Sequence, residues 1–303
     1  MLDSLVTEAV YPDSRDIDAL PTEQLLGVIH EADRTICDAV QLEIPRIAIA
    51  VDRIAALLAA GGRMFYIGAG TSGRLGVLDA SECPPTFHSP PEMVQGIIAG
   101  GDVALRHAVE RAEDQPEQGR ADLEAKQLSA ADAVVGIASS GRTPYVVGAL
   151  TYARGLNAFT VALSAVPDSE IGTIAHLSIA TVTGPEVITG STRMRAGTAT
   201  KLVLNMISTG IMIRLGYVYG NLMVNVEPTN SKLEDRAQRI IAAATGVSRE
   251  EAAALLVKAG SVRAAIVMRK LGVSRQEAEE QVRRAKGRLR VALGEPERST
   301  ERK

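Results

Sequence analysis

The chain has 303 residues, which suits either a large α/β domain with an appendage or about two domains of roughly 150 residues. Its 33 Lys and Arg residues against 36 Asp and Glu residues give a net charge of −3, which argues against a protein that binds nucleic acid or an anionic membrane. Aromatic residues make up only 3% and Trp is absent, so no aromatic platform for bases or sugars is expected. The two cysteines, Cys37 and Cys83, form no CxxC pair. The first residues, Met1 to Glu8, lack the basic stretch followed by an apolar stretch with which a secretory signal begins. We therefore expect a cytoplasmic protein without a secretory signal.

The first part of the chain is expected to be helical. Apolar residues recur at helical spacing from Thr22 to Ala60, and Pro45 predicts a break between two helices. Gly61-Gly62 ends this pattern, so residues 1–60 are interpreted as a helical lead-in.

In the next part of the chain, residues 61–225, short apolar runs alternate with segments long enough to form a helix. The first run, Met64 to Ile67, leads directly into a glycine-rich turn. The alternation predicts an α/β fold with a doubly wound parallel sheet and helices on both faces. The further strands are expected at Val94 to Ile98, Ala133 to Ala138, Ala158 to Leu163 and Leu177 to Thr181.

After Gly190 the pattern is helical only. The most apolar segment, Ala196 to Leu215, falls short of the roughly 20 apolar residues that span a bilayer and is interpreted as a buried helix. Another helix is expected from Asn230 to Ala244, within a small C-terminal helical module over residues 226–303.

A short repeat marks this module. Ser248 with Glu251, and Ser274 with Glu277, stand three residues apart and predict two helices that open with capping boxes. Residues 246–303 hold 14 Lys and Arg and 8 Glu, a net charge of +6, for which a solvated helix face is the commoner explanation. No nucleic-acid site is predicted there.

The glycine-rich turn Gly68 to Gly73 matches GxGxxG, a pattern of dinucleotide sites that is weak evidence alone. An NAD site also needs an acid at the end of the next strand to hold the ribose. That strand runs into Ala99-Gly100-Gly101, and Glu92 lies before it, so NAD is not expected.

Three hydroxyl-rich loops could hold a phosphate instead. In the first, Thr71, Ser72 and Gly73 open a helix, where hydroxyls and backbone N–H groups can enclose an anion. A second loop, Ser139 to Pro144, follows another predicted strand, so both loops should lie at one edge of the sheet, where ligands of such sheets bind. A third, Gly190 to Arg193, adds a guanidinium. Helix capping would explain any one of them, but three together favour a phosphate site.

Carboxylates are the candidates for chemistry, because there is no HExxH, no GxSxG and no Cys/His cluster, and no metal site is expected. Glu82 is expected to close a helix from Arg74 to Ser81, since Pro84-Pro85 follows. There the negative end of the helix dipole would favour its protonated form, as a general acid requires. Glu110, Glu113 and Asp114 are expected at the end of a helix that begins near Asp102, with Glu110 and Glu113 on one face. An exposed, solvated carboxylate is the alternative for each.

Taken together, the motifs resemble those of the N-acetylmuramic acid 6-phosphate etherases, whose sugar-isomerase-type domain is shared with the glucokinase regulatory protein. The similarity extends from about Leu5 to Leu293. The motifs that carry it are Gly68-Ala-Gly-Thr-Ser-Gly-Arg-Leu-Gly76, Asp79-Ala-Ser-Glu-Cys-Pro-Pro-Thr86, Ile98-Ala-Gly-Gly101, Glu110-Arg-Ala-Glu-Asp114, Ser139-Ser-Gly-Arg-Thr-Pro-Tyr145 and Gly184-Pro-Glu-Val-Ile-Thr-Gly-Ser-Thr-Arg-Met194.

The resemblance implies a carbon–oxygen lyase of amino-sugar catabolism and cell-wall recycling that acts without metal or nucleotide. Such an enzyme cleaves the D-lactyl ether of N-acetylmuramic acid 6-phosphate, with water, to N-acetylglucosamine 6-phosphate and D-lactate. The catalytic carboxylates of the family correspond to Glu82 and Glu113. We assign Glu82 as the acid that assists departure of lactate from C3 and Glu113 as the base at C2, which then helps water to add. The two roles could be exchanged.

The resemblance also implies a substrate-binding set and a homodimer. Ser191, Thr192 and Arg193 would line the site, and the apolar helix from Ala196 to Leu215 is a candidate interface. The phosphate would be held by Thr71, Ser72, Gly73, Ser139, Ser140 and Thr143. The family pattern Thr-Glu-x-Arg-Asn is replaced here by Thr7-Glu8-Ala9-Val10-Tyr11, which puts the contacts of this segment in doubt.

Two other functions remain open. A phosphosugar sensor without catalysis would bind the ligand and control a protein partner. An aldose–ketose isomerase would use similar proton chemistry with no leaving group at C3.

Overall fold

The computed structural model describes residues 6–296, so part of the N-terminal segment that argued against a secretory signal, and Leu5, lie outside it. The chain forms two compact units. Among the described residues, the first comprises 6–82 and 90–210, and the second 83–89 and 211–296. Each is described by itself.

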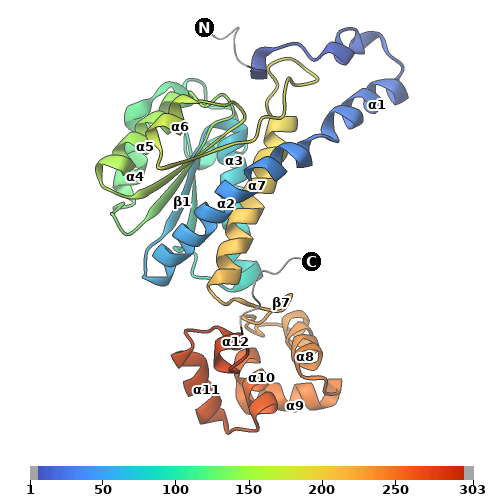
Figure 1. The fold of residues 1–303 in the computed structure, drawn as a ribbon, viewed down its shortest axis with the longest axis vertical. Coiled ribbons are helices and arrows are strands. Elements are labelled where there is room, and N and C mark those ends of the chain that lie inside the picture. Colours follow the sequence, from blue (N-terminus) through green and yellow to red (C-terminus); the bar gives the residue numbers. More distant parts are fainter. Residues whose placement is uncertain (1–5, 297–303) are drawn as a thin grey trace. The chain divides into compact units, whose positions relative to one another are not determined.

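A parallel sheet of five strands forms the centre of the first unit, in the order β2-β1-β3-β4-β5 (Figure 1). Every strand predicted from the sequence is present. The chain passes from β1 to β2 on one side and returns to β3 on the other, so the winding direction changes between β1 and β3. The strands are β1 (Met64–Gly68), β2 (Val94–Ile98), β3 (Ala133–Ile137), β4 (Phe159–Ser164) and β5 (Leu177–Ala180).

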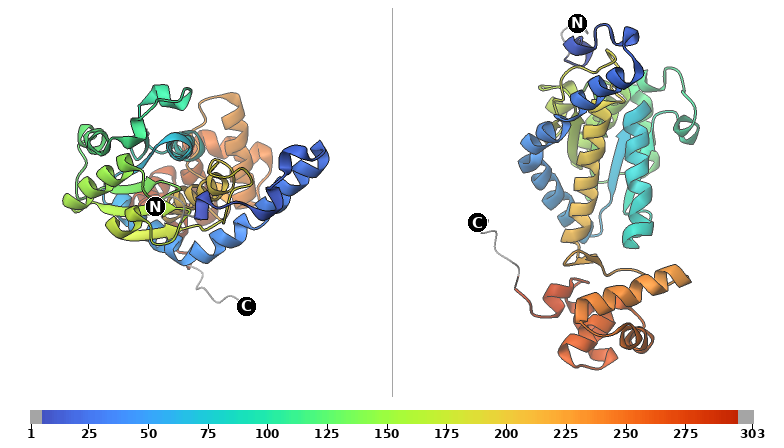
Figure 2. Two further views of the ribbon diagram at one scale, coloured as in Figure 1. Left: turned by 90° about the horizontal axis from the view of Figure 1, so that it is seen from above. Right: turned by 90° about the vertical axis from the view of Figure 1, so that its right-hand side faces the viewer.

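Helices cover both faces of this sheet, as expected for a doubly wound fold (Figures 1 and 2). Phe65 and Ile67 of β1 pack into the core on the face covered by α4 (Pro116–Ala125), α5 (Pro144–Gly155) and α6 (Glu170–Ile174). Tyr66 points to the opposite face, where its hydroxyl donates to the carbonyl of Leu204, 3.4 Å away. The helices of that face are α2 (Ile36–Ala59), α3 (Gly70–Phe87) and α7 (Arg195–Arg214).

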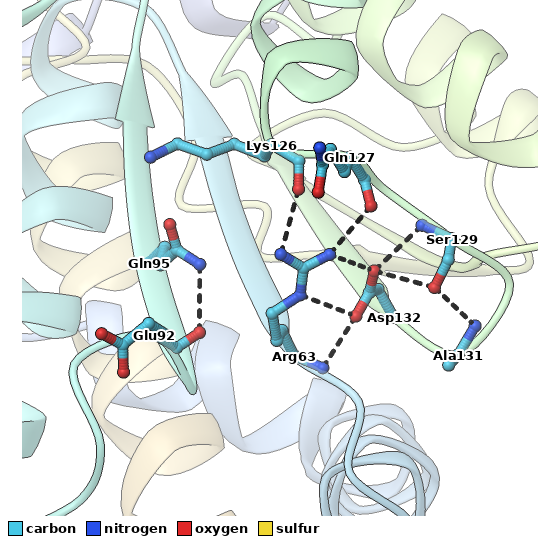
Figure 3. Close-up of polar contacts among 8 residues, drawn as sticks. All are labelled: Arg63, Glu92, Gln95, Lys126, Gln127, Ser129, Ala131 and Asp132. Atoms are coloured by element: carbon cyan, nitrogen blue, oxygen red, sulfur yellow. Dashed lines mark hydrogen bonds and ion pairs between the residues drawn. The ribbon is translucent and has the colours of Figure 1, made fainter.

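An ion pair ties the amino ends of β1 and β3 together (Figure 3). Arg63 Nη2 lies 2.8 Å from Asp132 Oδ2 and also donates to the carbonyl of Gln127, while Nη1 donates to the carbonyl of Lys126. Burial by itself would raise the pKa of Asp132, but hydrogen bonds from Arg63 and from the backbone N–H of Ser129 outweigh it and lower the pKa. This ion pair lies at the edge opposite the predicted phosphate loops and so has a structural role.

The break in the helical lead-in is not where the sequence predicted it. Helix α1 (Thr22–Asp33) ends at Arg34-Thr35, and α2 continues through Pro45. Pro45 is exposed, so the carbonyl that loses its partner at the proline can be satisfied by water. Three short 3₁₀ helices precede α1: η2 (Val6–Glu8), η3 (Pro12–Ser14) and η4 (Ile17–Ala19).

Helix α3 is longer than predicted at both ends. It begins at Gly70, in the glycine-rich turn, and runs through Pro84 and Pro85 to Phe87. Glu82 therefore does not close the helix, and the argument from the dipole at a helix end does not apply to it.

The helix expected from Asp102 to Asp114 is absent. Only two 3₁₀ turns form, η5 (Asp102–Leu105) and η6 (Ala112–Asp114), and Arg111, directly before η6, has a left-handed φ of 60°. Val109 folds back against Gly100, where an added Cβ would lie 3.0 Å from the Val109 Cβ. Glu110 and Glu113 consequently do not share a helix face.

The apolar segment near Ala196 forms α7, as predicted. By length and composition alone α7 passes as a candidate membrane span, the one such helix among residues 6–296. However, 56% of its apolar window is buried inside the protein, as in the core helix of a folded domain.

The second unit is a small helical core with one hairpin, β6 (Val218–Tyr219) and β7 (Leu222–Met223). Both predicted capping boxes are present, from Ser248 to Glu251 and from Ser274 to Glu277. Its helices are α8 (Ser231–Thr245), α9 (Arg249–Ala259), α10 (Val262–Leu271), α11 (Arg275–Arg284) and α12 (Leu289–Ala292). Apolar side chains from these helices and the hairpin form one buried cluster.

Candidate active site

The first loop lies where the winding of the sheet changes direction. Gly68 ends β1 and is paired with Ile137 at the end of β3. A Cβ on Gly68 would lie 2.9 Å from the backbone nitrogen of Gly73 and 3.0 Å from the Ile137 carbonyl oxygen, so only glycine lets the turn close this tightly. Thr71 and Ser72 follow in the first turn of α3, where backbone N–H groups lack helical partners, and the N–H of Gly73 donates to the Ala69 carbonyl at 3.2 Å. An anion is favoured there by both the donors and the helix dipole.

The second loop comes from β3, the neighbouring strand. Ser139 and Ser140 are half-buried, and Thr143 stands at the N-cap of α5 with Pro144 at the first helical position. Thr143 makes no side-chain capping hydrogen bond. Gly141 has a φ of +69°, and a Cβ there would lie 2.2 Å from the Ser169 Cβ. The loop is thus held in one shape at the end of β3, the strand that pairs with β1.

The third loop is anchored by two residues that the sequence analysis did not single out. The buried Glu186 carboxylate accepts hydrogen bonds of 2.9 Å from the backbone N–H groups of Arg195 and Ala196, at the start of α7. The buried Arg195 donates to the Pro185 carbonyl and to Thr35 Oγ1. The spacing of Glu186 and Arg195 follows no helical or strand period, and only Glu186 lies within the motif from Gly184 to Met194.

This loop also meets the first one. A Cβ built on Gly197 in α7 would lie 3.6 Å from Thr71 Cγ2, which places the start of α7 beside the start of α3. Ser191 and Thr192 are half-buried and Arg193 is exposed, just before α7. Three hydroxyl-bearing loops, distant in sequence, are thereby gathered at one edge of the sheet.

The N-terminal segment packs against the third loop despite its departure from the family pattern. A Cβ on Gly190 would lie 3.2 Å from Glu8 Oε2, and Ser14 Oγ donates to the Val187 carbonyl at 2.7 Å. The Tyr11 ring stacks on Arg195, with 5.6 Å from the guanidinium carbon to the ring centroid. Tyr11 thus supports the buried arginine of the third loop.

Of the two carboxylates, Glu113 lies at the edge where the loops gather. It is exposed in η6, which follows β2 and packs against α5. Arg74 Nε donates to the Leu105 carbonyl at 3.1 Å and so ties this segment to the first turns of α3. Glu82 is also exposed, but it lies twelve residues after Gly70 in α3, about 18 Å along the helix axis at 1.5 Å per residue.

Comparison with known proteins decides the family. The chain is 54% identical over 293 residues to the N-acetylmuramic acid 6-phosphate etherases of Yersinia pestis (strain Pestoides F) and Yersinia pseudotuberculosis serotype O:1b (strain IP 31758). Each match covers 96% of this chain and 99% of the relative. The chain belongs to the N-acetylmuramic acid 6-phosphate etherase family.

This etherase family member is also similar to two other kinds of protein. Residues 46–154 match the model of the glucokinase regulatory protein N-terminal SIS domain. A phosphoheptose isomerase from Francisella tularensis is similar in structure, with a TM-score of 0.48 and 18% identity over 64% of this chain and all of that chain.

Within residues 6–296 of the etherase family member, no group of three or more His, Cys, Asp and Glu side chains is placed to hold a metal ion. The hydroxyl loops and the two exposed carboxylates are the chemical groups that its motifs supply.

Proposed function

We propose that this protein cleaves the D-lactyl ether of N-acetylmuramic acid 6-phosphate, releasing N-acetylglucosamine 6-phosphate and D-lactate. The observation that carries the proposal is the 54% identity to etherases over 96% of the chain. The three hydroxyl loops at the carboxyl edge of the sheet support it, because that is where a sheet of this topology binds its ligand.

In this proposal the phosphate lies against the first turns of α3 and α5. Thr71, Ser72 and Gly73 hold it from one side, with Ser139, Ser140 and Thr143 on the other. Donors at a helix N-terminus suit a dianion, because they supply hydrogen bonds and a favourable dipole together. Ser191, Thr192 and Arg193 then face the rest of the sugar.

The reaction has two steps, elimination of lactate and addition of water, and each step requires two proton transfers. In the open-chain sugar, Glu113 takes the C2 proton, which is acidic because C2 is adjacent to the aldehyde. The electron pair forms the C2=C3 bond, the C3–O bond breaks, and Glu82 protonates the departing lactate oxygen. Water then adds at C3: Glu113 helps the addition by returning its proton to C2, and Glu82 accepts a proton from the water. The exchanged assignment of acid and base balances equally well.

The remaining features of the proposal follow from composition and family. The enzyme works in the cytoplasm as a homodimer, with no metal, nucleotide or other cofactor, in amino-sugar catabolism and cell-wall recycling. Its chain is organised as a lead-in (1–60), a phosphosugar domain (61–225) and a C-terminal module (226–303).

The decisive experiment incubates the purified protein with N-acetylmuramic acid 6-phosphate and measures D-lactate with a lactate dehydrogenase assay. We expect stoichiometric D-lactate and N-acetylglucosamine 6-phosphate. Binding without lactate would point instead to a phosphosugar sensor. Interconversion of plain hexosamine phosphates without lactate would indicate an isomerase.

A further inference from the structure

The helical second unit contains a cavity that the proposed reaction does not use. It lies between the start of α10, the second half of α11 and the turn that follows α11, and its volume is about 340 Å³. Small-molecule sites have volumes from about 300 to 1,000 Å³, so the cavity has room for a small organic molecule. Three of the side chains that line it are basic, Arg263, Arg283 and Lys286, and one is acidic, Glu279.

Arg263 brings a half-buried guanidinium to this cavity without a carboxylate to balance it. Its Nη2 donates to the Gly216 carbonyl at 3.1 Å, and its guanidinium carbon lies 5.5 Å from the centroid of the Tyr217 ring. Its Nε is buried and has no hydrogen-bond partner among residues 6–296, and no Asp or Glu of that range forms an ion pair with it. Burial accordingly lowers the pKa of Arg263 below its ordinary value. A cation that loses water without gaining a counter-ion is costly, and a bound anion would remove that cost.

The turn after α11 brings a second cation to the cavity. The N–H of Gly287 donates to the Val282 carbonyl at 2.9 Å, which closes the turn. Gly287 has a φ of +79°, and a Cβ there would lie 3.0 Å from Arg263 Nη1, so glycine leaves room for the guanidinium. Lys286 precedes it with a φ of 50°. The turn therefore fixes where the Lys286 side chain leaves the backbone, next to Arg263.

The other charged side chains at the cavity already have partners. Glu279 Oε1 accepts a hydrogen bond of 2.7 Å from Arg275 Nε, and Arg283 forms an ion pair with Glu280. Lys286 is exposed and forms no ion pair with any residue in the described part of the chain. Two positive charges at the cavity, one from the guanidinium and one from this lysine, are therefore left without a counter-ion.

We propose that this cavity binds a phosphate group, either as the free ion or at the end of a small organic molecule. A phosphate monoester carries close to two negative charges at neutral pH, which matches the two uncompensated cations, Arg263 and Lys286. Guanidinium and ammonium groups are the side chains with which proteins commonly bind phosphate. Ser261 caps the N-terminus of α10 at the same cavity, so the helix dipole favours the same anion. This is a second phosphate site, in the helical unit rather than at the sheet edge.

A nuclear magnetic resonance titration tests the proposal on the full-length protein. Inorganic phosphate and glucose 6-phosphate are added separately to isotope-labelled protein, and the backbone amide shifts are followed. We expect saturable shifts at Ala264 and Gly287 as well as at the sheet-edge loops. Tighter binding of glucose 6-phosphate would identify a phosphate monoester as the ligand, and tighter binding of inorganic phosphate the free ion. Potassium chloride at the same ionic strength is the control, because screening alone acts with any salt. Shifts that chloride reproduces, or shifts confined to the first unit, would overturn the proposal.

Substitutions then show whether the two cations hold the anion. Arg263→Gln should raise the dissociation constant measured at the Gly287 amide about tenfold or more, because a charge-assisted hydrogen bond is lost. Lys286→Ala should raise it about threefold, because an exposed charge contributes less. Lys258→Ala, at an exposed lysine of the same unit that does not line the cavity, should leave it unchanged.

The outcome stays decisive even if one variant misfolds. Circular dichroism checks the fold, and if Arg263→Gln does not fold, the exposed Lys286→Ala variant carries the test. Wild-type affinity at the Gly287 amide in Lys286→Ala would overturn the proposal. Binding is measured without turnover, so lactate release and this second phosphate site succeed or fail separately.

Discussion

Glu186 closes the N-terminus of α7 by accepting a hydrogen bond of 2.9 Å from the backbone N–H of Arg195, nine residues further along the chain. Its second carboxylate oxygen accepts from the next residue, Ala196, at the same distance. The side chain is almost completely buried. It therefore fixes the third hydroxyl loop from both ends.

Glu186→Ala should destabilise the protein by about 2 to 3 kcal/mol, because it leaves two buried N–H donors without partners. KM for the phosphosugar should rise as well, since Ser191 and Thr192 lose their support. Urea unfolding measures the first effect and steady-state kinetics the second. Glu110→Ala, an exposed carboxylate at the same sheet edge, is the control and should change the unfolding free energy by less than about 0.5 kcal/mol. Equal midpoints for both variants would contradict this role.

Ser72→Ala and Thr143→Ala should each weaken substrate binding. A hydrogen bond to a charged group contributes about 1.5 to 3 kcal/mol, so KM should rise roughly tenfold to a hundredfold in each. Inhibition by inorganic phosphate should weaken in parallel. Thr151→Ala, an exposed position within α5, is the matched control. An unchanged phosphate inhibition constant in both site variants would remove these hydroxyls from the phosphate site.

Gly141→Ala should distort the second loop. The added Cβ would meet the Ser169 side chain at 2.2 Å and would also sit at a φ of +69°. Gly220→Ala shares the positive φ, at +62°, but has nothing within 4 Å, so it isolates backbone strain of about 1 to 2 kcal/mol. We expect Gly141→Ala to be the more destabilising of the two and to lower kcat/KM. Comparable activity in the two variants would show that the shape of the loop does not matter.

The Arg63–Asp132 pair should make stability depend on acid pH. The pKa of Asp132 is lower in the folded protein than in the unfolded chain, where an Asp titrates near about 3.9. Its contribution is therefore fully present above about pH 4 to 5 and is lost as the pH falls through the folded value. Urea midpoints measured from pH 7 to pH 3 should decline less steeply for Asp132→Asn than for wild type. Asp102→Asn, at an exposed residue, should follow the wild-type slope.

Local patterns predicted the strands, both capping boxes and the apolar helix correctly. They failed where a proline predicted the end of a helix, and where a run of residues that favour helices predicted a helix. Pro45, Pro84 and Pro85 are all inside helices. The segment after Gly101 forms no helix, because Val109 folds back on Gly100 and Arg111 adopts a left-handed conformation. In these cases tertiary packing overrides local propensity.

The sequence by itself determined the sheet, the hydroxyl loops and the family, because strand periodicity, glycine turns and motif identity are local properties of the chain. Only the tertiary structure decided which of those groups can meet. It brought the three loops and Glu113 to one edge, since parallel strands end together there. It also placed Glu82 far from the first turn of α3, because every residue of an α-helix adds the same length along the helix axis.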